Sequence, residues 1–134
     1  MTAIATIEGI GPAYAAKLAE AGVKTTNRLI KVAGSKAGRK QLAEDTGLSE
    51  GQILEWLNRA DLMRVRGVGE EYSDLLERAG VDSPTELAQR NPDNLYEALI
   101  AETKKGNVVR RPPSLSEVRR WKEHAATLEK VVTH

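Results

Sequence analysis

Cysteine and phenylalanine are both absent from this sequence. Without cysteine, the chain cannot form a disulfide framework, a thiolate metal site, a redox pair or a cysteine nucleophile. Aromatic residues are few, with three tyrosines and two tryptophans. The core must therefore be built from leucine, valine, isoleucine and alanine, which favours packed helices over a β-sandwich.

An excess of charge of either sign is also missing. The 134 residues contain 20 lysines and arginines against 19 aspartates and glutamates, a net charge of +1, which predicts neither a strong polyanion binder nor an acidic tail. No apolar run is long enough to span a bilayer, and the N-terminal residues carry no basic leader. With 40% hydrophobic residues, we expect one compact domain or two small ones, located in the cytoplasm.

What the sequence does contain is an internal repeat. Residues 7–33 and residues 65–91 align without a gap. The matched pairs include Gly9 with Gly67, Gly11 with Gly69, Tyr14 with Tyr72, Leu18 with Leu76 and Leu29 with Leu87. We interpret this pattern as a duplication, with a first repeat over residues 1–62 and a second over residues 63–134.

Helix start and stop signals divide each repeat into about four helices. Proline and hydroxyl or amide residues stand where helices begin, and glycines stand where they end. The expected start signals are Pro12, Thr25 or Thr26, Ser35, Ser49, Ser83, Asn91 and Ser114. Because no segment shows sustained alternation of apolar and polar residues, we expect an all-α fold of two tandem repeats in one pseudo-symmetric globule.

Each repeat opens with two glycines around one apolar residue, just before a helix. We name residues 9–11 the first glycine turn and residues 67–69 the second glycine turn. The apolar residue between the glycines is expected to point into the core. The helix that follows offers unpaired backbone N–H groups and the positive end of its dipole, which together favour an anion such as a phosphate.

These stretches resemble the helix-hairpin-helix family, whose pattern continues with a small residue and then an apolar one. Ala15 and Leu18 fill those places in the first repeat, and Ser73 and Leu76 fill them in the second. The whole chain, including residues 56–62 and 110–115, also looks like a bacterial and archaeal family of tandem helix-hairpin-helix proteins. That family is catalogued as a domain of unknown function.

The resemblance implies that a hairpin holds a DNA backbone phosphate without reading sequence. It points to Gly9, Gly11, the amide of Ala13 and Lys17 in the first repeat. In the second repeat it points to Gly67 and Gly69, helped by Arg64 and Arg66. Glu70 and Glu71 stand at the second helix start, where their charges would repel a phosphate.

The near-neutral net charge conceals strong segregation of charge along the chain. Residues 24–40 hold six basic residues and no acid, residues 64–102 hold nine acids against four bases, and residues 103–122 hold seven bases against one acid. Lys24 and Arg28 in the first basic segment, and Arg110 and Arg111 in the second, are therefore candidate backbone ligands. Alternatively, the basic segments could pair with the acidic one, within a molecule or between molecules, or form solvated faces.

The remaining distinctive residues favour structural roles. Trp56 and Trp121 lie on apolar helix faces and are expected to anchor the core, with base stacking as the alternative. Tyr14 and Tyr72 are expected to pack nearby, with contact of one ring to a ligand as the alternative. We expect the last helix, with Trp121, to lie beside the first glycine turn of the same chain, and the alternative is that the last helix of a partner chain lies there. No metal site, cofactor or enzyme motif is recognisable.

Two functional hypotheses follow from the sequence. The first is a non-enzymatic helix-hairpin-helix protein that binds a DNA, or RNA, backbone without strong sequence specificity, mainly through its first repeat. The second is a protein-interaction or scaffold module, including self-association, that keeps the hairpins for packing only.

Overall fold

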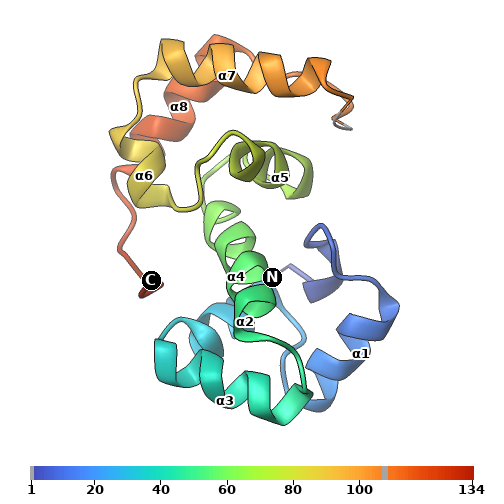
Figure 1. The fold of residues 1–134 in the computed structure, drawn as a ribbon. Coiled ribbons are helices and arrows are strands. Elements are labelled where there is room, and N and C mark those ends of the chain that lie inside the picture. The colour runs from blue at the N-terminus through green and yellow to red at the C-terminus, as the bar shows by residue number, and fades with distance from the viewer. Residues whose placement is uncertain (1, 107–108) are drawn as a thin grey trace. The chain divides into compact units, whose positions relative to one another are not determined.

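The computed structural model describes residues 2–106 and 109–134, and within these ranges the regular secondary structure is helical (Figure 1). The described residues form eight α-helices, one short 3-10 helix and no strand, apart from a single bridge between Ala3 and Thr25. The all-α prediction is confirmed. The elements are η1 (Ile4–Thr6), α1 (Pro12–Glu20), α2 (Thr26–Ala33), α3 (Lys36–Thr46), α4 (Glu50–Leu62), α5 (Glu70–Arg78), α6 (Pro84–Gln89), α7 (Pro92–Lys104) and α8 (Leu115–Ala125).

Most of the described helices begin at a residue whose side chain caps them. Thr25 and Ser35 each accept a hydrogen bond from the backbone N–H three residues ahead, at 3.1 and 3.0 Å. Ser83, Asn91 and Ser114 do the same for α6, α7 and α8. Such caps satisfy backbone donors that have no partner inside the helix. The predicted helix starts are confirmed because capping depends on local sequence alone.

The chain divides into two compact units. The first unit comprises residues 1–61 together with Val131–His134, and the second comprises Leu62–Lys130. The sequence-based division at residue 62 did not anticipate that the last four residues belong with the first unit. They do so because Val132 is buried and the N–H of Thr133 donates to the carbonyl of Gly34 at 2.8 Å.

Each unit has an aliphatic core with one tryptophan. In the first unit, α2 packs on α3, and buried residues from η1, α1 and α4 join them, including Ile4, Leu18, Leu29, Leu42, Ile53, Trp56 and Leu57. In the second unit, α8 packs against α6 and α7, beside which it lies in Figure 1. The core there includes Val68, Leu75, Leu76, Leu87, Leu99, Val118 and Trp121.

Candidate functional site

The first glycine turn leads into α1 with a backbone that only glycine adopts without strain. Gly9 has φ +93°, and a methyl group placed on it would lie 3.4 Å from Nε1 of Trp56. Ile10 is buried, as expected from the sequence. The conformation and the close approach of the indole together require glycine at position 9.

The start of α1 is open and carries no acidic residue. Gly11 is the N-cap and supplies no side-chain cap, and a methyl group placed on it would meet nothing within 4 Å. Pro12 has no N–H, so the amides of Ala13 and the residue after it are the donors without an acceptor inside the helix. Lys17 lies further along the same helix and is exposed. This arrangement provides the elements of an anion site.

The second glycine turn has the same local geometry, but its helix start is acidic whereas that of α1 is uncharged. Gly67 has φ +89°, and a methyl group placed on it would lie 3.0 Å from Nε1 of Trp121. Gly69 is the N-cap of α5, whose first turn contains Glu70 and Glu71. The two carboxylates favour the helix dipole and disfavour an approaching phosphate.

A tryptophan from a later helix covers each glycine turn. The ring centroids of Tyr14 and Trp56 are 5.1 Å apart with a 57° tilt, and those of Tyr72 and Trp121 are 5.1 Å apart with a 50° tilt. The packing role expected for these four aromatic residues is confirmed. The expected position of the last helix is wrong, because Trp121 of α8 contacts the second glycine turn and Trp56 of α4 contacts the first.

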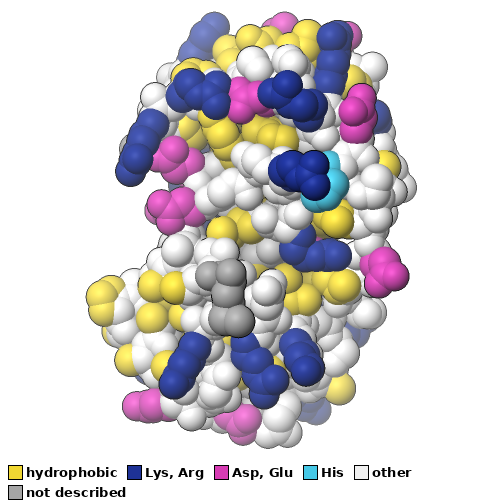
Figure 2. Space-filling model, turned by 180° about the vertical axis from the view of Figure 1, so that it is seen from behind, with side chains coloured by type: hydrophobic (Ala, Val, Ile, Leu, Met, Phe, Trp, Pro, Cys, Tyr) yellow, Lys and Arg dark blue, Asp and Glu magenta, His cyan; other side chains and the backbone are white. Residues whose placement is uncertain are grey.

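Five of the six basic residues of the segment 24–40 are exposed. They are Lys24, Arg28, Lys31, Lys36 and Lys40. None of the five lies within 4.0 Å of a carboxylate in residues 2–106 and 109–134. We name these five residues the basic face. Figure 2 shows several dark-blue side chains on the surface of the first unit.

Arg39, the sixth basic residue, does not belong to that face. It is only 4% exposed, and its Nη1 donates to the carbonyls of Ala33 and Gly34 at 3.0 and 3.1 Å. Its Nη2 donates to the carbonyl of Thr133 in the C-terminal segment. The guanidinium thus ties the end of α2 to that segment, which corrects its sequence-based placement among solvent-facing charges.

Helix α1 separates the basic face from the first glycine turn. Lys24 follows the C-terminal end of α1, whereas Gly11 and Ala13 stand at its N-terminal end. A helix of this length spans about 12 Å. Lys24 and Arg28 therefore follow the end of α1 that lies opposite to the first glycine turn.

The basic segment 103–122 is largely neutralised inside the second unit. Arg111 makes two hydrogen bonds to the carboxylate of Glu117, at 2.7 and 2.9 Å. Arg110 pairs with Glu71 at 3.5 Å, and Arg119 pairs with Asp93 at 3.2 Å. Over this unit, dark-blue and magenta side chains alternate in Figure 2. Folding back of the basic segment onto acidic residues therefore accounts for these three arginines.

The Arg111 bond lowers the pKa of the Glu117 carboxyl from 4.5 to about 2, with further help from the backbone and hydroxyl of Ser114. A carboxyl group whose pKa is lower in the folded chain than in the unfolded chain stabilises the fold at pH values above its unfolded-state pKa. This contribution is lost as the pH falls toward 2. We therefore expect the free energy of unfolding of the protein to fall between about pH 5 and about pH 2, and to fall less in Arg111→Gln.

Urea denaturation followed by circular dichroism at several pH values would measure this difference. Arg119→Gln is the matched control, because it removes an equal charge from the same unit without touching Glu117. An equal pH dependence in Arg111→Gln and in the unchanged protein would contradict the assignment.

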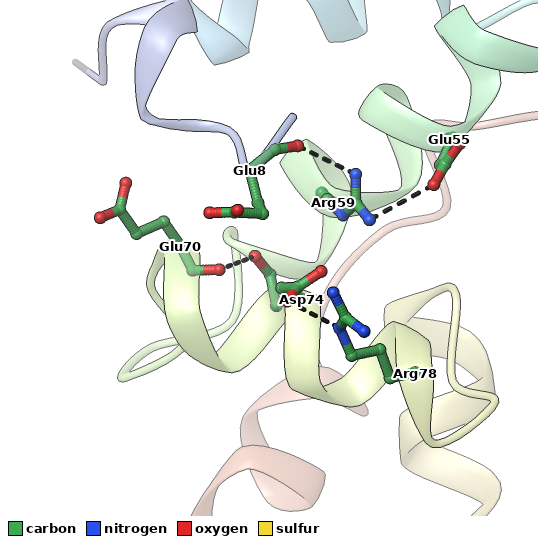
Figure 3. A network of polar contacts seen from close by, with 7 residues as sticks. Glu8, Glu55, Arg59, Glu70, Asp74 and Arg78 are labelled. Atoms are coloured by element: carbon green, nitrogen blue, oxygen red, sulfur yellow. Dashed lines mark hydrogen bonds and ion pairs between the residues drawn. The ribbon is translucent and has the colours of Figure 1, made fainter. Parts of the chain in front are cut away.

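Two side chains contact the glycine turns in a way that was not predicted from the sequence. Arg59 donates to the backbone carbonyl of Glu8 at 2.9 Å and pairs with Glu55 at 3.3 Å (Figure 3). In the second unit, Nδ1 of His124 accepts from the backbone N–H of Arg66 at 2.8 Å. Both stand three residues after the covering tryptophan, and that shared spacing is the signal that could have found them.

No helix among the described residues is both long enough and apolar enough to cross a membrane.

Comparison with known proteins places the chain in one family. No curated protein and no solved structure matches the chain. One family matches nearly its whole length, over residues 8–128. The chain therefore belongs to the family described as Domain of unknown function (DUF4332).

Proposed function

We propose that the glycine turns are helix-hairpin-helix elements and that the first unit binds a nucleic-acid backbone without strong sequence specificity. The observation that carries the proposal is the basic face, five exposed cations without a carboxylate partner among the described residues. Unpaired cations on a surface bind polyanions by releasing counterions, and they do so without sequence preference. The same unit holds the helix start that lacks acidic residues.

In this proposal, one phosphate accepts hydrogen bonds at the first glycine turn, from the backbone between Gly9 and Ala13. Lys17 neutralises that phosphate from the same helix, while Lys24 and Arg28 neutralise its neighbours along the strand. DNA and RNA share this backbone chemistry, so the proposal covers both. The protein acts here as a binding module and not as an enzyme.

For the second unit, the alternative of a packing or protein-interaction role is favoured. Its turn residues Gly67 and Gly69 precede two glutamates, and Arg110 and Arg111 already pair with carboxylates. A phosphate would have to displace these pairs. We therefore propose that this unit adds little to backbone binding.

The proposal predicts that Lys24→Glu combined with Arg28→Glu weakens DNA binding at low salt by at least about tenfold and lowers the salt dependence of log K by about two. Both side chains are exposed, so the fold should be unaffected. Fluorescence anisotropy with labelled duplex and single-stranded DNA at two salt concentrations measures both quantities.

The matched control is Lys104→Glu combined with Lys105→Glu, which makes the same change in net charge at the end of α7 in the second unit. This control should retain most of the binding. Equal losses in the two double variants would mean that net charge alone governs binding. Undetectable binding by the unchanged protein at low salt would refute the proposal.

A further inference from the structure

A hollow of about 460 Å³ lies in the second unit, between α8 and the second glycine turn. Its volume falls within the range of small-molecule sites. The lining residues are Arg66, Gly67, Glu117, Arg120, Trp121, Glu123, His124 and Thr127. None of them belongs to the basic face, so this is a site distinct from the one proposed above.

The position matching His124 in the first unit is occupied by a longer side chain. Arg59 follows Trp56 by three residues, as His124 follows Trp121. The guanidinium of Arg59 approaches Gly9, with Nη1 3.5 Å from where a methyl group on that glycine would lie. In the second unit the shorter imidazole stands there, and the space beside Gly67 is open.

The residues around Arg59 in the first unit and around His124 in the second unit also differ in the sign of their charge. Arg59 is held by the backbone of Glu8 and the carboxylate of Glu55. The residues at the matching places of the second unit are Arg66 and Arg120. Both are exposed, and neither lies within 4.0 Å of a carboxylate in the described part of the chain. In the first unit the cation beside the glycine turn is Arg59 itself, whereas in the second unit Arg66 and Arg120 line the hollow beside the turn.

His124 adds a hydrogen-bond donor to these charges. Its Nδ1 accepts from the backbone N–H of Arg66, so the neutral ring carries its proton on Nε2. Of the two glutamates in the lining, Glu117 is already bonded to Arg111 and to the N–H of Ser114. Glu123 remains to accept hydrogen bonds from hydroxyl or amino groups of a ligand.

We propose that this hollow binds a phosphate monoester that carries an organic body with hydroxyl groups, as a nucleoside monophosphate does. Guanidinium groups bind phosphate oxygens in paired, charge-assisted hydrogen bonds, which suits Arg66 and Arg120. The hollow is larger than a phosphate alone requires, and the remaining volume accommodates the organic body.

Titration of the ¹⁵N-labelled full-length chain with adenosine monophosphate tests the proposal. We expect saturable shifts at the amides of Arg66 and Gly67 and at the indole N–H of Trp121, and no such shifts with adenosine. Arg120→Gln should weaken binding by about tenfold or more. Arg119→Gln, one residue away and paired with Asp93, should change it by less than about twofold.

Two further variants distinguish this hollow from the basic face. His124→Leu keeps a side chain of similar size but removes both the Nε2–H donor and the acceptor for the N–H of Arg66, and it should weaken the binding of adenosine monophosphate. Lys24→Glu with Arg28→Glu should leave the affinity unchanged, so failure of nucleic-acid binding and failure of this site are distinguishable.

A phosphate monoester could be a free nucleotide or the end of a nucleic acid. Shifts at the same amides with a 5′-phosphorylated oligonucleotide, but not with adenosine monophosphate, would assign the monoester to a nucleic-acid end. Absence of saturable shifts with both ligands up to about 10 mM would overturn the proposal, as would equal binding by Arg120→Gln and Arg119→Gln.

Discussion

Replacement of Trp56 by alanine is expected to lower the free energy of unfolding of the protein by about 3–5 kcal/mol. The indole is 2% exposed, contacts the ring of Tyr14 and covers Gly9. Removing it leaves a cavity beneath the first glycine turn, and the surrounding aliphatic residues can fill that cavity only in part. The turn would also lose the surface that fixes its conformation.

Urea denaturation followed by far-ultraviolet circular dichroism measures this loss. Trp56→Phe is the matched comparison, because it keeps an aromatic ring against Tyr14, and it should cost less than the alanine variant. A loss below about 1 kcal/mol in Trp56→Ala would show that the indole does not support the turn.

Replacement of Arg39 by alanine is expected to cost about 3 kcal/mol, although the residue belongs to a segment of lysines and arginines. The variant leaves the carbonyls of Ala33, Gly34 and Thr133 without their charged donor. A hydrogen bond from a charged group contributes about 1.5–3 kcal/mol, and buried acceptors left unpaired add a penalty. The C-terminal segment should detach first, because Arg39 is one of its anchors.

Lys40→Ala is the control, because Lys40 is the next residue and is exposed. Its effect on stability should stay within about 0.5 kcal/mol. Hydrogen exchange adds a local measurement, since the N–H of Thr133 donates to Gly34 and should exchange faster in Arg39→Ala than in Lys40→Ala. Equal exchange and equal stability in the two variants would contradict the role assigned to Arg39.

Much of the secondary structure could be predicted because its signals are local. Ser35 and Ser114 cap their helices with a hydrogen bond that spans three residues. Gly47 ends α3 with φ +75°, a conformation that glycine adopts without penalty. The apolar helix faces also identified Trp56 and Trp121 as core residues, and both are 2% exposed.

The candidate site was less predictable, because a charged residue's role depends on partners far away in the chain. Arg39 and its acceptor Thr133 are 94 residues apart, and Arg110 and Glu71 are 39 apart. In the sequence, Arg39 and Lys40 are alike. In the structure, one is buried against carbonyls and the other is exposed.

The sequence by itself determined the helices and the two glycine turns, since caps and left-handed glycines act over a few residues. The tertiary structure alone decided which tryptophan covers which turn and which arginines remain available to a ligand. Packing decided both, because a guanidinium is available only where folding brings no carboxylate or carbonyl to it. The basic face therefore follows from the arrangement of the helices, and not from the number of basic residues in the segment.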